Sequence, residues 1–252
     1  MTPIDIKWHS AGMHQVDPSA AWEDTALRSR LAMMKYPKRR SEARLGRWTA
    51  KAAVAMAVGL DADDAETLHR IMVRNAPDGA PEVEVDGAHA GLTIAMTDRA
   101  DWAVCAVVEG PTRVGCDLEL VEPRSPAFVG DYFTAHEQAL VRHAANPELS
   151  GNLVWSAKES ALKVLRTGLR RPAKSVEVHL TDGDGNGWSA LTVHDSDTGR
   201  TFPGWWIRYG EFVLTIAASS DSRHPLSFDQ PPPLASATPA HSWISEISSW
   251  KG

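Results

Sequence analysis

Two acidic side chains lie close together in the segment 114–119. Alternate side chains of a strand share a face, so Asp117 and Glu119 are expected to point the same way, while Cys116 and Leu118 face a core. Neighbouring carboxylates repel each other unless a cation or a proton lies between them. Oxygen ligands without imidazole or thiolate neighbours favour Mg²⁺ or Mn²⁺. The segment therefore predicts either a magnesium-type site or an ordinary strand whose polar face is in water.

A second stretch of the chain, which begins near Trp155, has the pattern of a helix with two different faces. An apolar stripe through Ala157 is expected to face the core. Trp155, Glu159 and Lys163 follow one another at intervals of four on another face. Because Trp is rare on an exposed face, we expect another part of the protein to cover Trp155. Glu159 is then either the partner of Lys163 in a surface ion pair or a third metal ligand, with Lys158 and Lys163 as phosphate contacts.

The two segments taken together are more specific than either one alone. The order and spacing of 115–119 and 155–163 resemble the paired signature of the 4′-phosphopantetheinyl transferases. The closer match is to the monomeric, two-lobed type that serves peptide and polyketide synthases and includes the activator of surfactin synthetase. The segment 132–137, which ends in Glu137, and the region 39–51 also resemble parts of this family, and the resemblance extends over 28–219.

This resemblance implies an α+β fold made of two similar, pseudo-symmetric lobes with coenzyme A bound between them. It implies an Mg²⁺-dependent transferase that moves the 4′-phosphopantetheine arm of coenzyme A to a serine of an acyl or peptidyl carrier protein. The other product of this transfer is adenosine 3′,5′-bisphosphate. Such an enzyme is a holo-carrier-protein synthase, and we expect it to be monomeric and cytoplasmic.

The resemblance also implies roles for individual residues. Three carboxylates would hold the metal, two lysines would contact the phosphates, and basic residues of the first half would bind the adenosine 3′-phosphate. At the transfer step, Glu137 would accept the serine proton directly or through water, or complete the metal site, while Lys163 would assist proton transfer. The implied metal ligands are Asp117, Glu119 and Glu159, the phosphate contacts Lys158 and Lys163, the nucleotide contacts Arg40, Arg47 and Lys51, and the catalytic residues Glu137, Glu159 and Lys163.

Two positions depart from the pattern of this family. The family usually has a Ser-His pair whose histidine touches a phosphate of coenzyme A, but counting back from Cys105 gives Thr97 and Asp98. The Asp98 carboxylate would oppose the phosphates unless it were protonated or bridged by the metal. Ala80 also replaces the lysine of a Gly-Lys-Pro run. These changes leave open a degenerate protein that binds coenzyme A or a carrier protein without transfer. A metal-dependent phosphodiesterase that uses the same carboxylates is a second alternative.

The elements that position these residues follow from hydrophobic periodicity and turn residues. Helices are expected at 20–31, 41–58, 134–145 and 153–166, with Asn152 as the cap of the last, and a short helix through Leu68 and Met72. Strands are expected at 92–96, 102–108, 114–121, 176–180, 190–193, 205–209 and 212–217, with a hairpin between the second and third. We predict an N-terminal lobe over 1–112, a C-terminal lobe over 113–220 and a loose Pro- and Ser-rich tail over 221–252. Within the tail, a short amphipathic helix that docks back on the body is expected to contain Trp243, Ile244, Ile247 and Trp250.

Composition restricts the class of protein. The chain has 252 residues and 27.4 kDa, with 43% apolar and 23% charged residues, which is typical of a globular protein. The net charge of −6 argues against a general nucleic-acid coat, and the apolar run 103–108 is too short to cross a membrane. Cys105 and Cys116 lack metal-site spacing and are expected to be buried. We expect coenzyme A and a carrier protein as partners, without nucleic acid or membrane. The arginines at 166, 170 and 171 would either meet an acidic carrier or form a solvated basic face.

Overall fold

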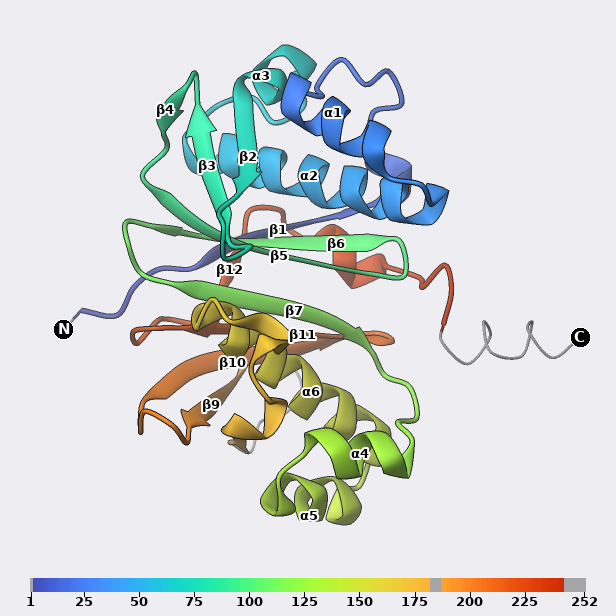
Figure 1. Ribbon diagram of the computed structural model, residues 1–252, viewed down its shortest axis with the longest axis vertical. Helices are drawn as coiled ribbons and strands as arrows, with labels where there is room; N and C mark the ends of the chain where they lie inside the picture. The colour runs from blue at the N-terminus through green and yellow to red at the C-terminus, as the bar shows by residue number, and fades with distance from the viewer. Residues whose placement is uncertain (1, 182–186, 243–252) are drawn as a thin grey trace, which may run out of the picture.

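The computed structural model describes residues 2–181 and 187–242 and has two main β-sheets in its middle, with helices on the outer side of each (Figure 1). This arrangement agrees with the predicted mixed α+β class. The first sheet has the strand order β12-β1-β6-β5, and the second has the order β7-β11-β10-β9-β8. A small third sheet has the order β2-β3-β4.

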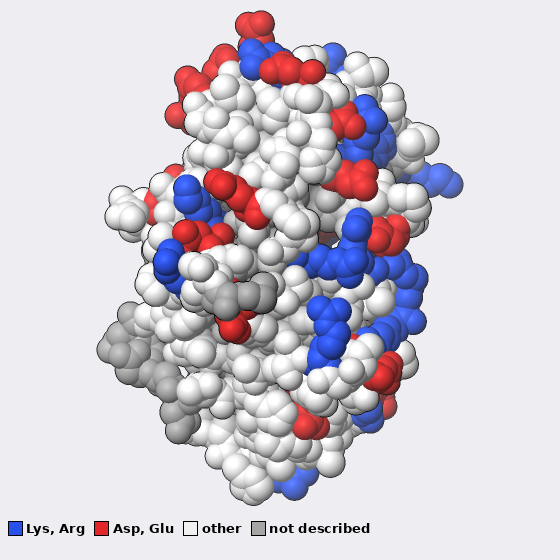
Figure 2. Space-filling view, turned by 90° about the vertical axis from the view of Figure 1, so that its left-hand side faces the viewer, with Lys and Arg blue, Asp and Glu red and all other residues white. Residues whose placement is uncertain are grey.

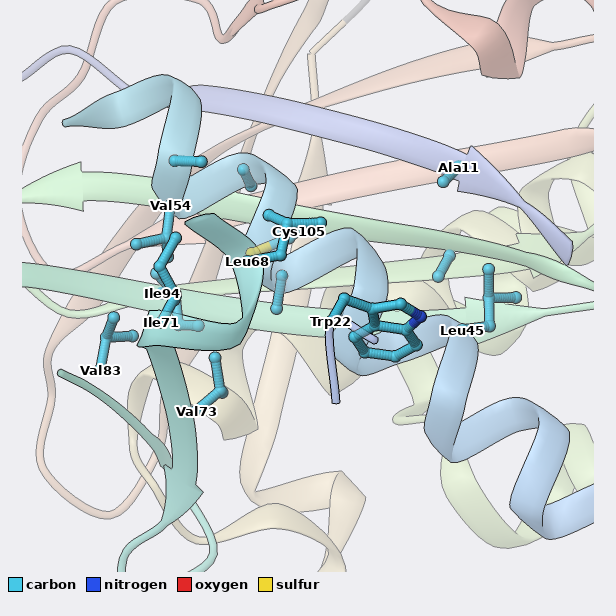
Figure 3. Close-up of a cluster of buried hydrophobic side chains, with 14 of the residues drawn as sticks. Ala11, Trp22, Leu45, Val54, Leu68, Ile71, Val73, Val83, Ile94 and Cys105 are labelled. Carbon is cyan, nitrogen blue, oxygen red and sulfur yellow. The ribbon is translucent and has the colours of Figure 1, made fainter. Parts of the chain in front are cut away.

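The first sheet is covered by helices from the N-terminal half of the chain. Its strands are β1 (Lys7–Gly12), β5 (Leu92–Arg99), β6 (Trp102–Glu109) and β12 (Leu226–Ser227). The helices are α1 (Thr25–Met33), α2 (Pro37–Ala57) and α3 (Ala65–Arg70), and the small sheet contains β2 (Ile71–Asn75), β3 (Pro81–Val85) and β4 (Ala88–His89). Figure 3 shows the apolar cluster on this side, in which Val54, Leu68, Ile71, Ile94 and Cys105 lie together.

The second sheet carries the long helix α6 (Pro147–Val164) on its outer face (Figure 1). Its strands are β7 (Val114–Leu120), β8 (Val176–Leu180), β9 (Ser189–Asp195), β10 (Thr201–Tyr209) and β11 (Phe212–Ala218), and two short helices, α4 (Pro126–Tyr132) and α5 (Ala135–His143), precede α6. The helix α6 begins earlier than predicted, because Asn146 rather than Asn152 accepts the capping hydrogen bond from Leu149 N (2.9 Å). Asn152 is instead buried inside the helix.

The inner faces of the two main sheets pack on each other. Cys116 and Leu118 of β7 share one apolar cluster with Trp8 and Val104 of the first sheet and with Leu214 of β11. The predicted inward orientation of Cys116 and Leu118 is therefore confirmed, and so is the burial of both cysteines. This packing leaves the alternate side chains of β7, Asp117 among them, on the face toward α6.

The predicted hairpin between the second and third strands is wrong. The strand β7 pairs with β11, with Asp117 opposite Thr215, whereas β6 pairs with β1 and β5. The turn residues from Gly110 onward do not fold the chain back but carry it from the first sheet to the second. The hairpin lies one strand earlier, between β5 and β6, where Ala100 and Asp101 have positive φ values of 51° and 65°.

The segment predicted as a loose tail is folded over its described part. The strand β12 pairs with β1 in parallel, and the Asp229 carboxylate lies 2.7 Å from Nδ1 of the nearly buried His9. Leu234 is fully buried, and Trp102 Nε1 donates to the Thr238 carbonyl (3.1 Å). This segment has few apolar residues, so the sequence does not indicate that it packs on the body. It is held there by the backbone pairing of β12 with β1 and by the buried Leu234. The predicted helix with Trp243, Ile247 and Trp250 lies outside the described residues.

Candidate active site

The helix α6 lies unusually close to β7 because one residue of the strand has no side chain. A Cβ atom on Gly115 would collide with the backbone carbonyl of Ser160 and would lie 3.0 Å from Lys163 Cβ. The contact is fixed by hydroxyl groups, since Ser156 Oγ and Ser160 Oγ lie 2.9 Å and 2.7 Å from Thr215 Oγ1 of β11. Glycine on the strand and serines on the helix thus place one turn of α6 directly over Asp117.

Asp117 is the centre of the resulting group of charges. Its side chain is 10% exposed, and its Oδ1 atom accepts hydrogen bonds from Lys163 Nζ (2.9 Å) and Thr97 Oγ1 (3.3 Å). Its second oxygen, Oδ2, is buried and has no hydrogen-bond partner among the described residues. A buried carboxylate oxygen without a partner lowers the stability of the fold, and a bound cation would remove this loss by coordinating the oxygen.

Glu159 lies on α6, one turn before Lys163, as predicted. Burial and the nearby Asp117 and Glu119 carboxylates raise the pKa of Glu159 to about 7. Burial opposes the charge of Lys163, yet Asp117 and Glu159 raise the pKa of Lys163 above its ordinary value. The carboxylates of Asp117 and Glu159 and the ammonium group of Lys163 therefore form one interacting group at the contact of β7 and α6.

Glu119 also belongs to this region, but arginines hold its carboxylate. Its Oε2 atom lies 3.1 Å from a nitrogen of Arg124 and 3.4 Å from Nε of Arg99. Burial and Asp117 raise the pKa of Glu119 against the opposing effect of these arginines. No group of three His, Cys, Asp or Glu side chains in the described chain is already arranged to hold a metal ion. Carboxylate oxygens are nevertheless the ligands that a hard cation such as Mg²⁺ prefers, and Asp117 Oδ2 has no other partner among the described residues.

Asp98 lies beside the same cluster, at the end of β5. Protein atoms crowd Asp98 although its side chain reaches solvent, and this burial together with the Glu42 and Asp117 carboxylates raises its pKa to about 6, against the effect of Lys163. In the β5–β6 register, Asp98 is paired with Ala103. Its neighbour Thr97 bonds to Asp117, so the Thr97-Asp98 pair lies next to the carboxylates.

Lys158 and Glu137 lie elsewhere and are bonded to each other. Both side chains are 0% exposed, and their charged atoms are 2.7 Å apart. Lys158 also donates to the backbone carbonyls of Ala173 and Val176, while Glu137 accepts from the backbone N–H of Val178 (2.8 Å). The structure therefore gives these two residues a buried setting without access to substrate, in contrast to the phosphate and proton-transfer roles that the resemblance implies.

The three basic residues predicted to bind the nucleotide are separated in the structure. Lys51 is fully buried and lies 2.8 Å from the Asp24 carboxylate. Arg40 lies at an open groove between α1 and α2. Arg47 alone points toward the region between the two halves, where its guanidinium donates to Asn75 Oδ1 and to Met96 Sδ (3.5 Å).

A cavity of about 750 Å³ lies next to Lys163, between the first-half strands β3 and β5 and the end of α6. Its lining combines apolar surface with several cations. Figure 2 shows Lys and Arg side chains gathered at the middle of the molecule on this side. The lining includes the predicted loop 79–81, Met96, Arg113, Lys163, Arg166 and Arg170. Arg166 Nε lies 2.9 Å from Asp78 Oδ2 and thereby ties the two sides of the cavity together.

Several residues around this site were missed by the sequence-based prediction. Arg99 and Arg124 are single arginines in loops or at a strand end, and their sequence positions carry no signal that they reach Glu119. Glu137 was named as a catalytic candidate, but its structural role was missed although the sequence carries a signal for it: Thr134 followed three residues later by Glu137 is a capping-box pattern. The structure contains that box, with Thr134 N donating to Glu137 Oε2 (2.8 Å).

Comparison with known proteins supports the resemblance at the level of the superfamily. Residues 113–217 match the family model of the 4′-phosphopantetheinyl transferase superfamily. The matched segment includes β7 and α6 and therefore Asp117, Glu119, Glu159 and Lys163. A search of curated proteins finds no match. Within the described residues, every helix is too short or too polar to span a membrane.

Proposed function

We propose that this protein transfers the 4′-phosphopantetheine arm of coenzyme A to a serine of an acyl or peptidyl carrier protein. The observation that carries the proposal is the 2.9 Å contact of Lys163 with Asp117, with Glu159 near enough to interact electrostatically with both, within the segment that matches the transferase superfamily. A cavity of nucleotide size opens directly beside Lys163. The finer assignment is a monomeric, cytoplasmic holo-carrier-protein synthase that uses Mg²⁺.

The proposed metal site uses the carboxylates of β7 and α6. Asp117 would contribute the buried oxygen that lacks a partner, and Glu159 would face it from the helix. Glu119, whose Oε2 atom lies next to Arg99 and Arg124, would complete the site. Mg²⁺ held by these groups supplies charge neutralisation to the pyrophosphate of coenzyme A.

The nucleotide is assigned to the cavity, with its phosphates toward Lys163. The raised pKa of Lys163 keeps this side chain protonated, so it serves as a fixed positive charge for a phosphate. Arg47 and Arg30 both donate to Asn75 Oδ1, so two guanidinium groups converge on a neutral oxygen without a carboxylate between them. Burial and the nearby Arg30 lower the pKa of Arg47 to about 10. An anionic group such as the adenosine 3′-phosphate would relieve this repulsion.

The transfer step forms one bond and breaks one bond. The serine oxygen of the carrier attacks the phosphorus next to pantetheine, and the bond to the bisphosphate oxygen breaks. Glu159, which lies one turn before Lys163 on α6, is assigned to take the serine proton through a water molecule while it also holds the metal. The burial of Glu137 and Lys158 assigns them to the framework that holds α5, α6 and β8 rather than to this step.

The proposal also includes two related lobes. The α2 segment Trp48-Thr49-Ala50-Lys51 and the α6 segment Trp155-Ser156-Ala157-Lys158 share their pattern, and each helix covers the outer face of one main sheet. In this alignment Ala52 and Met56 of the first half stand where the second half has Glu159 and Lys163. Only the second half therefore carries the charged residues that the proposed reaction needs.

Mass spectrometry of an apo carrier protein, incubated with the protein, coenzyme A and Mg²⁺, tests the proposal. We expect the carrier to gain the mass of one phosphopantetheine arm, and the gain to disappear when its acceptor serine is replaced by alanine. Binding of coenzyme A without any mass gain would favour the degenerate binding protein instead. Cleavage of coenzyme A without modification of the carrier would favour the phosphodiesterase.

A further inference from the structure

An open groove of about 470 Å³ lies between α1 and α2, apart from the cavity beside Lys163. Leu31, Ala32 and Pro37 give it apolar surface, and Arg40 gives it positive charge. Arg44 also lines the groove, but it is paired with the Glu23 carboxylate there (2.6 Å). The groove and the cavity share no lining residue. Such a combination of apolar floor and cationic border fits an apolar side chain that is surrounded by carboxylates.

Large apolar side chains stand exposed next to this groove. Met33 at the end of α1 is 77% exposed, and Tyr36 immediately before α2 is 70% exposed. Within the described chain, these are the two most exposed large apolar side chains. Arg40 fixes the connection between the helices, because its guanidinium donates to the Met34 carbonyl (2.9 Å). An exposed apolar pair on a structured connection is typical of a surface that another molecule covers.

The same region is the most basic part of the chain. Residues 25–57 contain nine lysines and arginines but a single acidic residue, Glu42, in a protein whose net charge is −6. Arg47 and Lys51 are buried and Arg44 is paired with Glu23, so the other six cations give this surface its positive charge. Three of these cations, at 38, 39 and 40, occupy the first turn of α2, where the helix dipole disfavours positive charge. Their unfavourable position for helix stability indicates that an anionic partner is attracted to this end of the helix.

The groove also lies near the proposed active site. Glu42, which follows Arg40 on α2 by two residues, is near enough to Asp98 to help raise the pKa of that carboxyl group. In Figure 1 the connection between α1 and α2 and the turn between β5 and β6 lie on the same side of the molecule. A protein bound at the groove would therefore be next to the place where its serine must react.

We propose that this groove, with Met33, Lys35 and Tyr36 beside it, docks the carrier protein through an acidic surface patch that surrounds an apolar side chain. The inference rests on the proposed function for the identity of the partner. It assigns the α1–α2 surface to the protein substrate and the cavity beside Lys163 to the nucleotide substrate. The resemblance had instead placed Arg40 with the nucleotide.

Charge reversal at the groove tests this assignment. Ala32→Glu places a carboxylate in the groove, and Lys35→Glu reverses an exposed charge beside it. Arg208→Glu, on an exposed part of β10, is the matched control for a general change in net charge. The steady-state parameters are measured for the full-length protein with an apo carrier protein and coenzyme A, and thermal melting checks that each variant folds.

We expect Ala32→Glu and Lys35→Glu each to raise the KM for the carrier about tenfold, with kcat and the KM for coenzyme A unchanged. The control is expected to change neither KM. Added salt should raise the KM for the carrier in the wild type and have less effect in the variants. A rise in the KM for coenzyme A alone, or no change in either KM, would overturn the docking assignment.

Direct binding separates the failure of this assignment from the failure of the proposed function. Fluorescence anisotropy of a labelled apo carrier reports docking without any transfer. If the wild type binds the carrier but does not modify it, and Lys35→Glu removes that binding, the docking assignment stands while the transferase proposal fails. If the wild type modifies the carrier and the variants bind it as tightly as the wild type does, the docking assignment fails alone.

Discussion

Lys51 of α2 and Lys158 of α6 are held by the same set of contacts in the two halves of the molecule. Each side chain is fully buried, and each pairs with one carboxylate, Asp24 at 2.8 Å and Glu137 at 2.7 Å. Each also donates to two backbone carbonyls of neighbouring segments, those of Trp22 and Leu68 for Lys51 and those of Ala173 and Val176 for Lys158. Both lysines thus connect a central helix to the chain segments around it.

The buried position of Glu137 and Lys158 leads to a prediction about stability rather than chemistry. Glu137→Gln removes the charge that compensates Lys158, and an unpaired buried charge costs about 3–5 kcal/mol. We expect the free energy of unfolding, measured by urea denaturation, to fall by about that amount. Asp24→Asn should act in the same way through Lys51. A catalytic role for Glu137 would instead give a stable variant with a greatly reduced kcat.

Glu159→Gln is expected to have the opposite result. The fold should remain intact, because this side chain lies outside the apolar stripe of α6, while carrier modification should be abolished. The free energy of unfolding of the variant should also depend less on pH than that of the wild type. In the wild type, a carboxyl whose pKa is raised from 4.5 to about 7 stabilises the fold fully below its unfolded pKa, and this contribution is lost as the pH rises through 7.

Urea denaturation at pH 5 and pH 8 checks this expectation without an activity assay. The loss of stability between these two pH values should be smaller in Glu159→Gln than in the wild type. Mg²⁺ at pH 8 should raise the melting temperature of the wild type and have less effect on the variant. Equal stabilisation of both proteins by Mg²⁺ would contradict the assignment of Glu159 as a ligand.

The sequence predicts those helices and strands whose apolar residues follow a regular local pattern. The strands that now form β5, β6 and β7 were located correctly, because β-branched and apolar residues alternate or run together there. The partner of β7 was not predictable, since Asp117 pairs with Thr215 of a strand far away in the sequence. Local pattern does not encode such long-range pairing.

The candidate site was predictable only in its signature residues. Asp117 lies on β7, and Glu159 and Lys163 lie one turn apart on α6. These residues come together because Gly115 lets the helix approach the strand closely. The side-chain partners of Lys158 were not predictable in the same way, because helix position does not tell whether a lysine reaches solvent or a buried carboxylate. Its burial follows from Glu137 and from the carbonyls at the start of β8, which only the fold brings near.

The folded segment after Ser222 leads to a prediction that replaces the expectation of a loose tail. Leu234 is fully buried between β1 and β10, and its backbone N–H donates to Ser10 Oγ (3.1 Å). Leu234→Ala should lower the free energy of unfolding by about 2–5 kcal/mol. Removal of the whole segment after Ser222 should lower it further, because β12 then leaves the edge of β1 unpaired. Thermal melting that is unchanged in the truncated protein would restore the loose-tail interpretation.

Gly115→Ala tests whether the close approach of α6 is needed for the site. The new methyl group would overlap the Ser160 carbonyl, a backbone atom that moves only with the helix. We expect a loss of about 1–3 kcal/mol in the free energy of unfolding, typical of overpacking. Because Glu159 and Lys163 move with α6, kcat should fall more than the KM for coenzyme A rises. Ala217→Gly, opposite Gly115 on β11, controls for a general change in the stability of this sheet.

Asp98 gives the most informative single substitution, because three different roles predict three different results. If the carboxylate opposes the phosphates of coenzyme A, Asp98→His should tighten binding by about 1–2 kcal/mol through one charge-assisted hydrogen bond. The gain should be larger at pH 6 than at pH 8, because only the imidazolium carries the positive charge. The wild type should also bind coenzyme A more tightly as the pH falls through about 6, where Asp98 becomes neutral.

Calorimetry of coenzyme A binding to both proteins at pH 6 and pH 8, with saturating Mg²⁺, distinguishes these roles. If Asp98 is instead a ligand for the metal or its water, Asp98→His should weaken the response to Mg²⁺ and slow the transfer. If Asp98 only stabilises the turn after β5, the melting temperature should change while the affinity stays the same. The position of Asp98 between Glu42, Asp117 and Lys163 favours the first role, since a neutral or cationic side chain there removes one negative charge from the path of the phosphates. Unchanged affinity at both pH values would therefore remove Asp98 from the nucleotide site.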